Sequence, residues 1–113
     1  MKRGYTKPAS PDTWLRLQLH AANALVRFCD EHQYGGPSLE RVRSCRNALE
    51  VSDIAAAVSA YRMVPLGGNG CFNDWQPSQL TDNDAFEYAL AIFQALVERW
   101  SRLMSLSVAV YDA

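Results

Sequence analysis

The sequence lacks long apolar runs and an excess of either charge, and each absence narrows the class of protein. No apolar stretch approaches the roughly 20 residues that a membrane-spanning helix requires, so no membrane partner is expected. The formal net charge is -1, whereas a protein that mainly holds nucleic acid needs a strong basic excess. A small basic group (Arg41, Arg43, Arg46) has no interleaved aromatic residues and indicates ordinary solvated charge. A nucleic-acid partner is therefore not expected.

Cysteine is also scarce. The three cysteines, Cys29, Cys45 and Cys71, form no CxxC pair, whereas a secreted disulfide framework would use an even and denser set. The sequence starts with two basic residues, Lys2 and Arg3, but polar residues follow them where a signal peptide would have an apolar run. We therefore expect reduced thiols in a cytoplasmic protein.

What the sequence does contain is the composition of a globular domain. Its 113 residues are 49% hydrophobic and 20% charged, which suits one domain over residues 1–113 with a core of its own. Residues 1–10 are expected to be a flexible lead-in. No internal repeat or low-complexity segment is evident.

Apolar residues recur at intervals of three and four, which predicts an all-α fold of four helices packed as a small antiparallel bundle. The predicted helices cover 11–32, 38–51 and 54–63, with a last and strongest helix from 81 or 82. Ser10, Ser38 and the pair Ser52-Asp53 are the predicted caps for the first three. The glycines of residues 34–37 are predicted to end the first helix in a left-handed turn. Residues 107–111 are predicted to be a frayed end or a short extended segment.

One long loop, residues 64–82, interrupts this pattern before the last helix. Gly67, Gly68 and Gly70 are predicted to shape it, because glycine permits positive φ and close approach of the backbone. A loop of this length is uncommon in a compact domain and is often functional.

The run from Leu49 through Ser52-Asp53 to Gly67-Gly-Asn-Gly-Cys-Phe-Asn-Asp74 resembles small uncharacterised bacterial helical proteins. Those proteins carry a Gly-Gly-Met-Gly-Ser-Phe-Asn-Asp loop after a short helix. This sequence departs from that form at Asn69 and Cys71, and the resemblance covers about a quarter of the chain. It implies no established activity. Some proteins of this size lie beside toxins as immunity proteins, which is an association only.

The loop supplies the predicted partner-binding residues. Phe72, Asn73, Asp74 and Trp75 are the candidate contact or contact-shaping residues. Asp82 and Asp84 would add an acidic rim able to meet a basic partner. The alternative interpretation is structural: the glycines form a rigid turn while Phe72 and Trp75 plug the end of the bundle.

Catalytic, cofactor and metal sites are not expected. The Cys29–His32 pair with His20 lacks the repeated short spacings of a zinc site. Nothing in the sequence brings a base to Cys71 for nucleophilic catalysis.

The leading hypothesis is a non-enzymatic protein-binding domain, such as an immunity-type inhibitor that occludes a cognate toxin. Two alternatives stay open. One is a small enzyme or ligand-binding domain that uses residues 64–82 as a lid. The other is a structural homodimer through the apolar stripe of the last helix.

Overall fold

The computed structural model describes residues 11–34, 36–67, 71–72 and 83–111. Within these ranges the chain forms four α-helices and no strand. The helices are α1 (Pro11–Glu31), α2 (Pro37–Glu50), α3 (Ile54–Arg62) and α4 (Asn83–Tyr111). The predicted all-α class with four helices is confirmed.

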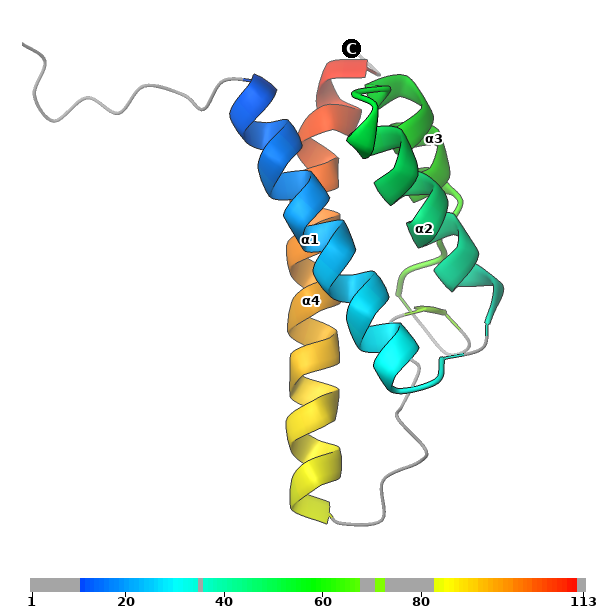
Figure 1. The fold of residues 1–113 in the computed structure, drawn as a ribbon, viewed down its shortest axis with the longest axis vertical. Helices are drawn as coiled ribbons and strands as arrows, with labels where there is room; N and C mark the ends of the chain where they lie inside the picture. Colours follow the sequence, from blue (N-terminus) through cyan, green and yellow to red (C-terminus); the bar gives the residue numbers. More distant parts are fainter. Residues whose placement is uncertain (1–10, 35, 68–70, 73–82, 112–113) are drawn as a thin grey trace, which may run out of the picture.

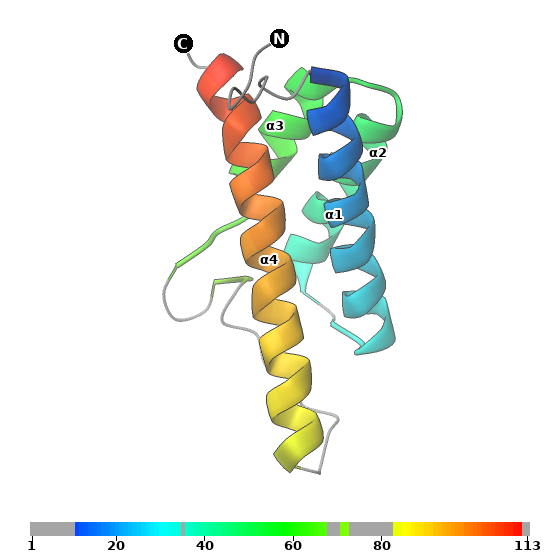
Figure 2. The ribbon, with the colours of Figure 1, turned by 90° about the vertical axis from the view of Figure 1, so that its left-hand side faces the viewer.

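The helices alternate in direction, so that each runs antiparallel to its neighbour in the chain (Figure 1). Helix α1 packs against α2 and α4, and α3 packs against the same two helices. The first and last helices therefore lie side by side, in agreement between the two views (Figures 1 and 2). The first turns of α4, the longest helix, extend past the C-terminal end of α1 (Figure 1).

The predicted apolar stripes meet in one core. Each helix contributes fully buried side chains, among them Leu25, Val42, Ala57, Phe93 and Trp100. Burying one large apolar side chain is worth about 1.5–3 kcal/mol, so this shared core is what holds the four helices together. The largest fully buried side chains are Trp100 and Phe93 of α4 and Phe72 of the loop before it.

Both α1 and α2 end in a Schellman motif whose left-handed residue is not glycine. At the end of α1, Gln33 has φ 59°, and the Tyr34 N–H donates to the Cys29 carbonyl at 2.9 Å. At the end of α2, Ser52 has φ 61°, and the Asp53 N–H donates to the Ala48 carbonyl at 2.8 Å. The prediction that a glycine of residues 34–37 forms the left-handed turn is wrong, because the chain reverses two residues earlier.

Two of the predicted caps can be checked. The Asp53 carboxylate accepts a hydrogen bond from the Ala56 N–H at 3.1 Å, which confirms it as the cap of α3. Ser38 is not the cap of α2: Gly36 takes that position and Ser38 is buried within the first turn. The reason is Pro37, which lacks an N–H and therefore suits the first helical position. Ser10 lies outside the described residues.

Gly36 lies under the side chain of its neighbour Tyr34. A Cβ at this position would lie 2.3 Å from the Tyr34 hydroxyl oxygen, because the tyrosine ring crosses over the glycine. The same ring packs edge-on against Phe72, with centroids 5.4 Å apart. The turn between α1 and α2 therefore holds an aromatic side chain against the core.

Residues 107–111 continue α4, so the predicted frayed or extended end is wrong. This segment packs against the core through Val108 and also makes a polar contact with α1. The buried Gln18 amide donates to the Ser107 hydroxyl at 2.7 Å and to the Leu103 carbonyl at 2.9 Å. Together these contacts hold the last turns of α4 against the bundle and override the strand propensity of Val108 and Val110.

Two arginines of the small basic group join helices to one another. Arg43 forms a bidentate ion pair with Asp30 of α1, and the Arg41 guanidinium donates to the Met63 carbonyl at the end of α3, at 2.7 Å. Both are bonded within the fold. In the described part of the chain, no helix is long and apolar enough to cross a membrane.

Candidate functional site

The structure describes only part of the predicted loop site. Asn73, Asp74, Trp75, Asp82, Gly68 and Gly70 lie outside the described residues, as do most of residues 64–82. Asp84 belongs to the first turn of α4. Gly67, Cys71 and Phe72 are described, and they define how the loop leaves the bundle.

Phe72 is a core residue. Its side chain is only 2% exposed, and its N–H donates to the Pro65 carbonyl at 2.9 Å. Its ring meets Tyr34 and Phe93 edge-on, with centroids 5.4 Å away in both cases. Phe72 therefore has no free surface to offer a partner, in accordance with the plug interpretation. In this position it can shape a contact site by fixing the loop.

Gly67 meets the predicted need for glycine. Its φ of 122° lies in a region that side chains disfavour, and no atom lies within 4 Å of a Cβ built there. Backbone conformation, rather than space, therefore requires glycine at this position.

The two buried thiols, Cys29 and Cys45, are weak nucleophiles. Burial raises the pKa of Cys29 to about 12, and the neighbouring Asp30 carboxylate adds to the rise. Burial also raises the pKa of Cys45 to about 12, although the nearby Trp100 indole opposes the rise in part. The Trp100 indole N–H is buried and has no hydrogen-bond partner among the described residues. Thiols that stay protonated at neutral pH are poor nucleophiles.

Cys71, the remaining cysteine, is half-buried. Within the described ranges, no hydrogen bond joins it to His20 or His32. The described residues also hold no cluster of three or more His, Cys, Asp and Glu side chains that could bind a metal ion.

A second candidate site, missed by the sequence analysis, lies on the outer side of α4. Of the five large apolar side chains exposed among the described residues, three belong to this helix: Tyr88 (72% exposed), Leu106 (39%) and Val110 (60%). They fall on one line at helical spacing, which we call the α4 stripe. Its members are Tyr88, Ile92, Ala95, Arg99, Leu103, Leu106 and Val110. At 1.5 Å per residue the stripe is about 33 Å long.

A groove runs beside the N-terminal half of the stripe, where α4 passes the C-terminal end of α1. It has a volume of about 240 Å³ and is lined by Phe28, His32, Ala85, Tyr88, Ala89 and Ile92. The His32 ring stacks on Phe28 with centroids 4.1 Å apart, and Phe28 in turn stacks against Phe93 at 6.0 Å. The groove floor is therefore continuous with the core, which makes this part of the stripe rigid.

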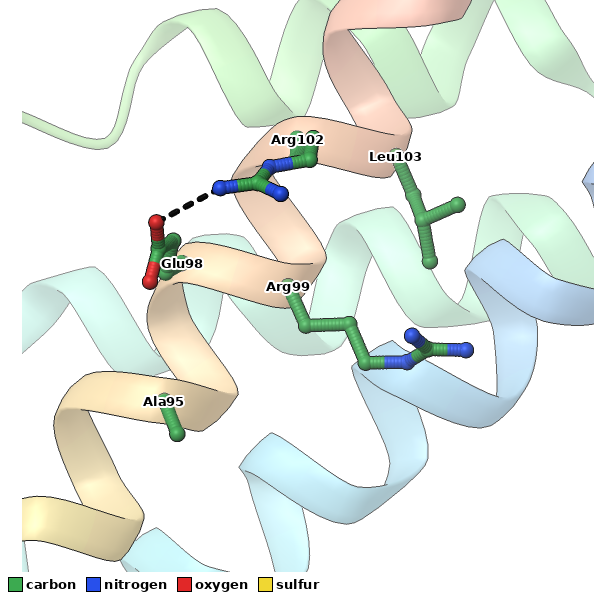
Figure 3. Close-up of a pocket in the computed structure, with 5 residues that line it drawn as sticks. All are labelled: Ala95, Glu98, Arg99, Arg102 and Leu103. Carbon is green, nitrogen blue, oxygen red and sulfur yellow. Dashed lines mark hydrogen bonds and ion pairs between the residues drawn. The ribbon is translucent and has the colours of Figure 1, made fainter.

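A smaller hollow of about 190 Å³ lies at the middle of the stripe, lined by Ala95, Glu98, Arg99, Arg102 and Leu103 (Figure 3). Glu98 and Arg102 form an ion pair at 2.7 Å across one turn of the helix. The Arg99 side chain extends away from that pair on the side of α1 (Figure 3). Among the described residues, Arg99 has no hydrogen-bond or ion-pair partner.

The α4 stripe thus combines apolar side chains with one exposed cation at its centre. Such a surface can bury a complementary apolar face and orient it through a charged hydrogen bond. Another hollow, between Leu66 and the Gln94, Val97 and Ser101 side of α4, lies on a different side of the helix. In comparisons of the chain with known proteins, no family model, no curated protein and no solved structure matches it.

Proposed function

We propose that this chain is a non-enzymatic protein-binding domain and that the α4 stripe is part of its contact surface. The observation that carries the proposal is the alignment of Tyr88, Leu106 and Val110, all exposed, on one side of one helix. Single exposed apolar residues are normal in soluble proteins, whereas contiguous apolar patches mark interaction sites.

The rigid setting of the stripe supports this function. The groove beside it lies over the stacked rings of Phe28 and Phe93. The C-terminal end of the stripe is fixed by the hydrogen bond between Gln18 and Ser107. A surface that is already ordered loses little conformational entropy on binding. The stripe begins near the N-terminus of α4, and the predicted loop site directly precedes that helix in the sequence. We therefore include both in one proposed contact region.

The finer form of the proposal is an immunity-type inhibitor that occludes a bacterial toxin. Its support is the resemblance of the Gly67–Asp74 loop to loops of small bacterial helical proteins, together with the small helical frame. Such a domain needs a stable surface and no catalytic groups. Location in the cytoplasm, where a toxin would be met, belongs to the same proposal.

The test is capture of partners from an extract of the source cell by three forms of the tagged chain. The first is wild type and the second carries Tyr88→Ser and Leu106→Ser. The third is a matched control with Val51→Ser and Met63→Ser, which changes two exposed apolar residues away from the stripe. Substitutions at exposed positions change the free energy of unfolding by about 0.5 kcal/mol or less, so all three should fold, which circular dichroism would verify.

The expected result is a protein retained by wild type and by the control but lost by the stripe variant. For the finer proposal, that protein should arrest growth when it is expressed alone and should be neutralised by co-expression of this chain. Capture of the same proteins by all three forms would show that the stripe is not the contact surface. Loss of a measured activity with Cys71→Ser would instead favour the alternative of a small enzyme that uses residues 64–82 as a lid.

A further inference from the structure

The shape of the α4 stripe suits the docking of one additional helix. It runs straight along α4, and its residues follow the three-and-four spacing that an amphipathic partner helix would match. The small side chains Ala85, Ala89 and Ala95 allow close approach at the two hollows. The larger Tyr88 and Leu103 form the walls around them. A stripe of about 33 Å accommodates roughly 22 residues of a partner helix.

The charge at the centre of the stripe restricts the partner. Arg99 is exposed, and no carboxylate in the described part of the chain pairs with it, whereas the nearby Arg102 is already neutralised by Glu98. A helix that covered the stripe would remove the Arg99 guanidinium from water. That removal is unfavourable unless a carboxylate replaces the lost hydration with charged hydrogen bonds.

A second copy of this chain does not meet that need. If two α4 stripes pair antiparallel about their midpoint, Tyr88 meets Val110 and Ile92 meets Leu106, but the midpoint is Arg99 itself. A parallel pair in register also places Arg99 against Arg99. Both arrangements bring two guanidinium groups together as they lose water, and like charges that face each other across an interface are disfavoured.

We infer, as a deepening of the proposed function on which it rests, that the stripe binds an amphipathic α-helix of a partner protein. The helix carries an Asp or Glu at its centre, which pairs with Arg99. Apolar residues about two turns from that carboxylate on one side and about one turn on the other fill the hollows beside Ile92 and Leu103. The pairing is charge-assisted and, with Arg, can be bidentate.

The test uses a displayed library of helical peptides as the probe. Each peptide has about 20 residues, with Leu or Ile at heptad positions and a randomised central position. The library is selected against wild type, against Arg99→Glu, and against Arg16→Glu. The last is a charge reversal at an exposed arginine of α1 that is not part of the stripe.

Wild type and the Arg16→Glu control should both enrich peptides with a central Asp or Glu, whereas Arg99→Glu should enrich a central Lys or Arg. For the best acidic peptide, anisotropy titration should show that Arg99→Ala weakens binding by about tenfold or more. The Arg99→Glu variant should regain binding when the central Glu of the peptide is changed to Lys. Tyr88→Ser should weaken binding of both peptides.

Three results would overturn the inference. Peptides enriched without a preference for central charge, or the same peptides enriched by Arg99→Glu, would show that Arg99 does not select the partner, and the proposed function would stand. A dimer of wild type in sedimentation that Tyr88→Ser and Leu106→Ser dissociate would show that the occupant is a second copy. No enrichment at all would exclude a helical occupant, and the capture experiment would then decide the proposed function separately.

Discussion

The side-chain amide of Gln18 on α1 donates a hydrogen bond to the hydroxyl of Ser107 on α4, at 2.7 Å and across 89 positions of the sequence. The same amide nitrogen also donates to the Leu103 carbonyl. The amide oxygen, in contrast, is buried and has no partner among the described residues. Gln18 therefore both fastens the first helix to the last and leaves one acceptor unsatisfied.

This asymmetry predicts opposite effects for two substitutions. Ser107→Ala should lower the free energy of unfolding by about 1–2 kcal/mol, because a buried amide hydrogen loses its acceptor. Gln18→Leu should be nearly neutral or stabilising, because it also removes the unsatisfied oxygen. Urea unfolding of both single variants and of the double variant would measure the coupling between the two sites. A large loss of stability with Gln18→Leu would show that the amide oxygen is satisfied in solution.

Phe72 provides a test of the plug interpretation. Phe72→Ala should lower the free energy of unfolding by about 3–5 kcal/mol, because it removes a fully buried ring from the core. Phe72→Leu should cost less, because much of the volume is kept. Cys71→Ser at the half-buried neighbouring position should change stability by less than about 1 kcal/mol. If Phe72→Ala left stability unchanged and only weakened partner capture, Phe72 would be a contact residue after all.

The ends of α1 and α2 offer a simple gain of stability. Gln33 and Ser52 both have φ near 60°, a conformation that costs side-chain-bearing residues energy and that glycine adopts freely. Gln33→Gly and Ser52→Gly should each raise the free energy of unfolding by about 0.5–1 kcal/mol. Gln33→Ala and Ser52→Ala, the matched controls, should give no gain, since alanine keeps the strain. Thermal unfolding would compare the four variants, and equal midpoints for Gly and Ala would contradict the prediction.

The buried thiols predict a loss of stability in alkali. The folded chain raises the pKa of Cys29 and Cys45 from 9.0 to about 12. Below about pH 9 both thiols are protonated whether the chain is folded or not, so this contribution to stability is fully present. As the pH rises from 9 to 12, the unfolded chain releases thiol protons that the folded chain keeps, and the free energy of unfolding falls.

Because tyrosine and lysine also titrate in that range, the measurement is a comparison. Urea midpoints of wild type should fall more steeply with pH than those of the Cys29→Ala, Cys45→Ala double variant. Cys71, present in both, serves as the internal control. Equal slopes for the two proteins would show that the buried thiols ionise as readily folded as unfolded.

The fold was predictable because most of its stability comes from one feature that the sequence displays directly. Phe86, Leu90, Phe93, Val97 and Trp100 recur at the helical interval, and three of them are buried in the core. The helix ends were less predictable. Gln33 and Ser52 adopt left-handed conformations that sequence patterns assign to glycine.

The end of α4 was mispredicted for a related reason. Val108 and Val110 favour strands locally, but Ser107 is buried and bonded to Gln18 from the other end of the sequence, and Val108 packs against the core, so tertiary contacts override that propensity. Local propensity carries no information about such a partner.

The α4 stripe is not identified from the sequence, because the core-facing series of α4 already accounts for most of the apolar residues of that helix. A second series at three-and-four spacing, from Tyr88 through Arg99 to Val110, was present in the sequence and could have been counted separately. Its exposure could not be deduced, since a helix covered on two sides would show the same pattern. Only the position of α1 and α3 around α4 leaves this side open.

The stripe lies on the last helix of the bundle, and its groove is completed by the end of the first helix. During synthesis this surface cannot exist until α4 has left the ribosome and has docked onto a helix made more than 50 residues earlier. A partner that recognises it thus distinguishes a finished bundle from an unfinished chain. By binding only the docked state, the partner would also draw the folding equilibrium towards completion.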